Sequence, residues 1–146
     1  MNYFKAAEEV LKSVPQLKQA KENLKKREKR IIESNAPRDL GAIDYSKPYI
    51  DSNSVNDTLN ELLELSECRK NITENDGKLD EIYGIVKQLE DKEKKFIQLW
   101  YFEKNSKETI MEKMSVESLT TVYNLKNRAV AEFALRYYGG SALPSI

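Results

Sequence analysis

The sequence predicts an all-α fold in which an N-terminal arm of long helices, a coiled coil or bundle, precedes a C-terminal unit of three shorter helices. Three observations support this fold class. The 146 residues include only 5 Gly and 4 Pro, so few positions favour turns. Apolar residues recur at steps of three, four and seven along most of the chain, as they do in helices. Short polar turns divide the last third into three helical segments.

The first helix is expected over residues 1–35. Its apolar face is made of residues three or four positions apart, Phe4, Ala7, Val10, Leu11 and Val14. A step of seven continues this face through Leu17, Leu24 and Ile31. Pro15 either kinks or breaks the helix or starts a new one, because Pro lacks a backbone N–H and suits a first helical turn. The helix should end near Asn35, ahead of Pro37.

Residues 36–53 are expected to form a connection. This segment has more apolar groups than a pure spacer needs, namely Leu40, Ile43, Tyr45, Tyr49 and Ile50, so we expect it to pack on another surface, such as a second copy of the chain. A long helix is then expected from a cap at Ser54. It has apolar residues seven positions apart, Leu65, Ile72, Leu79 and Val86. Gly77 is a candidate position for a kink, because Gly disfavours a helix interior by ~1 kcal/mol.

The net charge of zero hides an uneven distribution of charge along the chain. Residues 1–36 hold nine basic and five acidic residues, a balance of +4, whereas residues 54–90 hold four and nine, a balance of −5. Residues 91–146 hold nine and seven, a balance of +2. Antiparallel pairing of the two long helices, within one chain or between two, explains the basic run at 25–30. A direct contact of this run with phosphate is the alternative.

The last third is expected to form three helices, over residues 91–103, 107–114 and 118–138. Asp91, Ser106 and Ser118 are the predicted N-terminal caps. Gly139 and Gly140 should end the third helix. These lengths and short turns match a helix-turn-helix unit in its trihelical form, although a helical hairpin with polar exposed residues would give a similar pattern.

The third of these helices carries small polar and basic residues near its N-terminus, which is the part that enters the major groove in helix-turn-helix proteins. Asn and Arg can make paired contacts to base edges, Thr can contact a thymine methyl group, and Lys can reach phosphate. The candidate DNA-binding residues are Thr120, Thr121, Tyr123, Asn124, Lys126, Asn127 and Arg128.

Two strings in this region, Lys-Glu-Thr-Ile-Met-Glu-Lys-Met and Thr-Thr-Val-Tyr-Asn-Leu-Lys-Asn-Arg-Ala-Val, resemble region four of sigma factors, their C-terminal DNA-binding region. Three further strings are Tyr-Phe-Lys-Ala-Ala-Glu-Glu-Val-Leu, Ala-Ile-Asp-Tyr-Ser-Lys-Pro and Gln-Leu-Trp-Tyr-Phe-Glu-Lys-Asn-Ser-Lys-Glu. With them, nearly the whole chain resembles the small ArpU- and RinA-like transcription regulators of Gram-positive phages, which switch on late genes. Leu119 stands where such proteins often carry Arg or another polar residue, at the start of the recognition helix.

The resemblance implies a phage or prophage transcription regulator in the cytoplasm of a bacterial host. Residues 1–90 would form the arm that makes a homodimer, and residues 91–146 the unit that binds double-stranded DNA. RNA polymerase is a further candidate partner. Two alternatives stay open, an interaction protein that docks on RNA polymerase or a host protein, and a small terminase subunit.

No catalytic, cofactor or metal site is expected, so the sequence predicts a protein that is not an enzyme. The chain has no His and a single Cys, Cys68, which excludes zinc fingers, Cys–His nucleophile pairs and a disulfide framework built from this chain alone. The acidic residues Asp57, Glu61, Glu64 and Glu67 are expected to form a solvated or salt-bridged face. No apolar run approaches the ~18 residues of a membrane span, so no membrane partner is expected.

Overall fold

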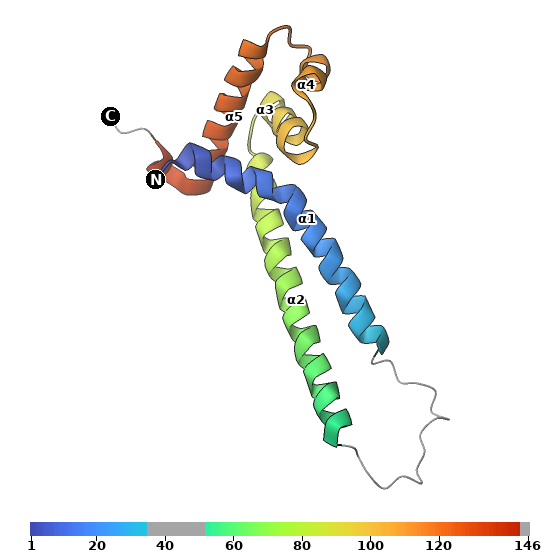
Figure 1. Cartoon of the computed structure of the whole chain (residues 1–146). Coiled ribbons are helices and arrows are strands. Elements are labelled where there is room, and N and C mark those ends of the chain that lie inside the picture. The colour runs from blue at the N-terminus through green and yellow to red at the C-terminus, as the bar shows by residue number, and fades with distance from the viewer. Residues whose placement is uncertain (35–51, 144–146) are drawn as a thin grey trace. The chain divides into compact units, whose positions relative to one another are not determined.

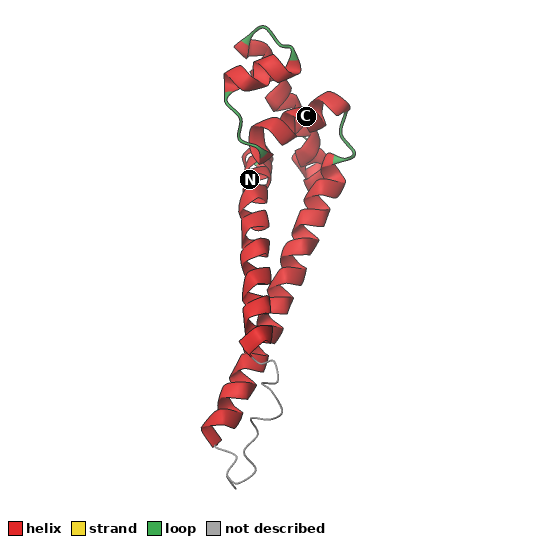
Figure 2. Ribbon diagram, turned by 90° about the vertical axis from the view of Figure 1, so that its right-hand side faces the viewer, coloured by secondary structure: helices red, strands yellow, loops and turns green. Residues whose placement is uncertain are grey.

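The computed structural model describes residues 1–34 and 52–143, and this part of the chain is helical without strands (Figure 2). Its elements are α1 (Tyr3–Ser34), α2 (Ser52–Val86), α3 (Asp91–Ile97), the π-helical turn η2 (Gln98–Phe102), α4 (Lys107–Met114), α5 (Leu119–Tyr138) and the 3-10 turn η3 (Gly139–Ala142). The predicted all-α class is therefore confirmed. None of the described helices has the length and apolar character needed to cross a membrane. Most of the expected connection at 36–53 lies outside the described residues.

Both long helices are continuous. α1 runs through Pro15, and α2 runs through Gly77 and begins at Ser52 rather than after a cap at Ser54. Pro15 cannot donate a backbone hydrogen bond within α1. The neighbouring side chains of Leu11 and Val14 are nevertheless completely buried, and their packing offsets that loss.

The chain divides into two compact units. We call Met1–Lys18 together with Gly77–Ile146 the head unit, and Gln19–Asp76 the hairpin unit. This division differs from the expected boundary between residues 90 and 91. The first part of α1 and the last part of α2 belong with the C-terminal helices because they supply apolar side chains to the same core.

The core of the head unit takes side chains from five helices. α5 supplies Val122, Ala129, Val130, Phe133 and Ala134, whereas α3 and α4 supply Phe96, Ile97 and Ile110. α1 adds Ala7, Leu11 and Val14, none of which has exposed surface, and α2 adds Leu79, Ile82 and Val86. An aromatic contact between Tyr3 and Tyr138, with ring centroids 5.2 Å apart, joins the start of α1 to the end of α5.

Serine caps begin α4 and α5, as predicted. The Ser106 Oγ accepts a hydrogen bond from the backbone N–H of Thr109, and the Ser118 Oγ accepts one from that of Thr121, both at 3.2 Å. Gly139 ends α5 with a φ of 76°, which confirms the predicted stop.

The predicted helix at 91–103 differs from the structure in two respects. Asp91 was expected to be the cap, but it is the first residue of α3, and Glu90 precedes it without a side-chain capping bond. The Asp91 carboxylate instead lies in the first turn, where negative charge favours the helix dipole. After Ile97 the helix widens into η2, and the Glu103 N–H donates to the Gln98 carbonyl at 2.9 Å.

In the hairpin unit, α1 and α2 lie side by side and antiparallel (Figure 1). Three ion pairs cross between them: Lys21–Asp76 at 2.6 Å, Arg27–Glu64 at 3.3 Å and Glu28–Arg69 at 3.3 Å. The buried Cys68 Sγ donates to the Leu24 carbonyl at 3.2 Å. The sequence left pairing within one chain and pairing between chains both open, and in this unit the long helices pair within one chain.

Leu11→Ala is expected to lower the free energy of unfolding of the head unit by about 2–5 kcal/mol, because it leaves a cavity at a fully buried position. Urea unfolding followed by the fluorescence of Trp100, the chain's one tryptophan, measures this change. Leu119→Ala is the matched control, since Leu119 is 47% exposed and its truncation should cost less than about 0.5 kcal/mol. Equal effects would contradict the place of residues 1–18 in the head core.

Candidate nucleic-acid interface

A tight turn leads from α4 into α5. Ser115 has a φ of 56°, in the left-handed region, and its N–H donates to the Glu112 carbonyl at 3.2 Å. The next N–H, that of Val116, donates to the Met111 carbonyl at 2.9 Å. These bonds satisfy carbonyls at the end of α4. The Ser118 cap then starts α5, so the turn fixes the N-terminal end of α5 against the short α4.

One face of α5 is polar and exposed. Thr120, Asn124 and Asn127 follow each other at steps of four and three, which aligns them along this face. Thr121 and Arg128 lie beside Asn124 at steps of three and four, and both are exposed. The structure therefore brings five of the seven predicted residues together on the side of α5 away from the buried core.

Lys126, also a predicted residue, does not share this face. It lies four residues after Val122 and four before Val130, both buried, so its side chain starts on the inward side of α5. Its Nζ is 3.4 Å from the Glu8 Oε2 and 5.4 Å from the centroid of the Trp100 ring, and its side chain is only 21% exposed. The ammonium group that was expected to reach phosphate is thus engaged within the head unit.

Glu8 also binds a second group from the C-terminal helices. The hydroxyl of the buried Tyr101 donates a hydrogen bond to the Glu8 Oε2 at 2.8 Å. Burial, together with this bond and the Glu8 charge, raises the pKa of Tyr101, so the phenol remains a neutral donor. Glu8 therefore ties α1 to η2 and α5 at once. Sequence reasoning missed this contact because nothing local signals a pairing across 93 positions.

Tyr123 lies at the edge of the polar face. Its ring packs edge-on against the ring of Trp100. The two ring centroids are 6.3 Å apart, and the two ring planes lie at 69° to each other. The Nζ of Lys107, from the first turn of α4, lies 5.0 Å from the centroid of the Tyr123 ring. A side-chain hydrogen bond to Tyr123 raises the pKa of Lys107, so a positive charge lies over this ring. Lys107 was not among the predicted residues.

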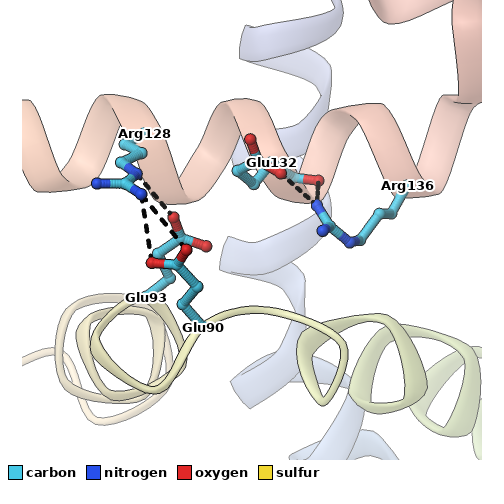
Figure 3. Close-up of polar contacts among 5 residues, drawn as sticks. All are labelled: Glu90, Glu93, Arg128, Glu132 and Arg136. Carbon is cyan, nitrogen blue, oxygen red and sulfur yellow. Dashed lines mark hydrogen bonds and ion pairs between the residues drawn. The ribbon is translucent and has the colours of Figure 1, made fainter.

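Arg128 is exposed but held by two carboxylates at the start of α3 (Figure 3). Its guanidinium lies 3.3 Å from Glu90 and 3.2 Å from Glu93. Glu93 is the buried member of this cluster, and burial raises its pKa; the Glu90 charge acts in the same direction and Arg128 opposes it. A separate ion pair, Glu132 with Arg136, lies further along α5. Arg128 therefore holds α5 against α3.

An open hollow of about 370 Å³ lies beside the polar face. Thr121, Asn124 and Arg128 line it from α5, and Lys92 lines it from α3. Its apolar lining comes from Met114, Val116 and Leu125. Lys92, which sequence reasoning missed, thus places an exposed cation next to three of the predicted residues.

The chain matches no known family model, and it has no match among curated proteins or among solved structures. The chemistry of the exposed α5 face therefore carries the functional inference. Amide and hydroxyl groups on one helical face, with cations at its edges, can hydrogen-bond to base edges while the cations contact phosphate.

Glu93→Gln is expected to change how stability depends on pH. Because the pKa of Glu93 is raised above its ordinary value of 4.5, the folded chain holds this proton at pH values where the unfolded chain has lost it. The wild type should therefore lose stability relative to Glu93→Gln as the pH rises above 4.5. Urea unfolding at a series of acidic pH values measures the difference. Glu9→Gln, at an exposed position of α1, is the control. The interpretation fails if Glu93→Gln parallels the wild type throughout.

Proposed function

We propose that this protein is a DNA-binding transcription regulator of a phage or prophage, acting on late genes in the bacterial cytoplasm. α3, α4 and α5 act as a trihelical helix-turn-helix unit, and α5 enters the major groove. The observation that carries the proposal is the exposed polar face of α5, on which Thr120, Asn124 and Asn127 are aligned. The resemblance to regulators of Gram-positive phages supports the late-gene role.

Each group on this face has a role in the proposed contact. Asn124 and Asn127 offer amide groups that can pair with the N6 and N7 atoms of adenine, and Thr120 can contact a thymine methyl. Lys92 and Lys107 are exposed at the edges of the unit and supply phosphate contacts. Arg128 positions α5, because its guanidinium is already paired with Glu90 and Glu93.

Electrostatic attraction to DNA is modest in this proposal. Residues 91–146 have a balance of only +2, and four of their cations are paired with carboxylates, namely Lys94, Lys126, Arg128 and Arg136. Nonspecific affinity grows with the number of phosphates that a protein neutralises. A homodimer that places two α5 helices on two half-sites raises the affinity without further charge on either unit.

Asn124→Ala is expected to weaken binding to DNA from upstream of late genes by about tenfold, since a good base-edge contact is worth roughly 1–3 kcal/mol. Binding to random DNA should be unchanged, and so should thermal unfolding, because Asn124 is exposed. Fluorescence anisotropy on both DNAs over a series of salt concentrations measures the effect. Asn23→Ala, at an exposed position in the hairpin unit, is the matched control.

Lys126→Met is a second control in this experiment. It should reduce stability through the loss of the Glu8 pair, yet leave the salt dependence of binding unchanged. The proposal is overturned if the wild type binds neither DNA at low salt, or if Asn124→Ala binds late-gene DNA as the wild type does.

A second candidate function is docking on RNA polymerase, with α5 as a protein-binding surface. The exposed apolar side chain of Leu119 at the first position of α5, one helical turn before the exposed Tyr123, favours it. A pull-down with RNA polymerase in the absence of DNA distinguishes the two functions. If the protein docks on RNA polymerase through α5, the polymerase should retain the wild type and Asn124→Ala but should not retain Leu119→Ala.

A further inference from the structure

The end of the hairpin unit where α1 finishes and α2 begins exposes large apolar side chains. Leu59 and Leu62 are each 54% exposed and Leu63 is 61% exposed, and the steps of three and four put them on one side of α2. Ile32, in the last turn of α1, is 43% exposed. The Arg27–Glu64 ion pair sets a register in which the last turn of α1 is level with the part of α2 that carries these leucines. We call these four residues the leucine patch.

Charged residues of opposite sign lie along the same stretch of the two helices. α1 presents Lys25, Lys26 and Arg30, all exposed, and α2 presents Asp57, Glu61 and Glu67. Within the part of the chain that the structure describes, none of these six takes part in an ion pair. The hairpin unit thus carries unpaired basic side chains on α1 and unpaired acidic side chains on α2 near the end where its apolar surface is exposed.

The occupant that fits both charges is a second copy of the same hairpin. A polyanion such as DNA would match α1 but would be repelled by α2, and a polycation would meet the opposite conflict. Two copies related by a twofold axis place α1 of each chain against α2 of the other, so that every basic segment meets an acidic one. The leucine patches then face each other in the middle, as apolar positions do in a four-helix bundle.

We propose that the leucine patch and these six charged residues form the surface through which two copies of this chain associate as an antiparallel four-helix bundle. This deepens the proposed function, because it assigns the surface of the proposed dimer. Its evidence lies entirely in the hairpin unit and does not involve α5. The hairpin formed within one chain is the element that dimerises, and dimerisation does not require the long helices to exchange between chains.

The apolar half of this proposal is tested by Leu62→Asp. Sedimentation equilibrium of the full chain should give the mass of a dimer for the wild type, and Leu62→Asp should weaken self-association by about tenfold or more, because the charge would be buried at the centre of the interface. Leu119→Asp is the matched control: this leucine has similar exposure but lies in the head unit, so its replacement should leave the dimer intact. Circular dichroism should show the same helix content in all three proteins, because both leucines are exposed.

The charge half is tested by reversing one helix at a time. A chain with Lys25, Lys26 and Arg30 replaced by Glu has two acidic helices, and a chain with Asp57, Glu61 and Glu67 replaced by Lys has two basic ones. Each should lose self-association when alone, through repulsion between its own copies. A mixture of the two should form a heterodimer, because α1 of each chain again meets an α2 of opposite charge. Heterodimer formation would also show that both variants remain folded.

Several results would overturn the proposal. One is a wild-type chain that remains monomeric at micromolar concentration. The leucine patch would then be covered by residues 35–51 or by another protein and not by a second copy. Others are a Leu62→Asp chain that dimerises like the wild type and reversed chains that do not combine. A dimer without DNA binding would remove the proposed function alone, and DNA binding by a monomer would remove this proposal alone.

Discussion

The docking of the N-terminal part of α1 into the C-terminal helices is the interaction on which the head unit depends. Leu11 and Val14 are buried in the same core as Phe133. The nearby Glu8 carboxylate accepts a hydrogen bond from Tyr101 and forms an ion pair with Lys126. Burial of a leucine-sized side chain is worth roughly 1.5–3 kcal/mol, so the segment contributes substantially to a domain of marginal stability. The three C-terminal helices therefore rely on residues from the opposite end of the sequence for a complete core.

The same contacts determine what α5 can present to a partner. Two of its cationic side chains, Lys126 and Arg128, are paired with carboxylates of α1 and α3. They hold the helix in place and leave amides and hydroxyls on the exposed face. Such a face suits hydrogen-bonding recognition better than bulk electrostatic attraction. In the proposed function, this arrangement lets a chain of zero net charge recognise DNA through hydrogen bonds, with a second copy adding to the affinity.

Local signals allowed much of this structure to be predicted. The caps at Ser106 and Ser118 and the stop at Gly139 depend on neighbouring residues, and all three were predictable. The effect of Pro15 was not, because the packing of the surrounding side chains decides whether a helix continues through a proline. The place of α1 in the head core was missed for a similar reason: an apolar helical face does not reveal which surface will cover it. At the site, five of the seven predicted residues share the exposed face, and the inward direction of Lys126 follows from its spacing to Val122 and Val130.

Native-state hydrogen exchange tests most directly whether residues 1–18 are an integral part of the head unit. Amide protons that belong to one cooperative unit exchange with the same opening free energy, because the unit unfolds as a whole. If α1 is divided as described, the amides around Leu11 and Val14 should exchange with the same opening free energy as those around Val130 and Phe133, and that energy should differ from the one shared by the amides around Glu28 and Arg69. Exchange of all of α1 with the hairpin amides, at an energy distinct from that of α5, would contradict the account.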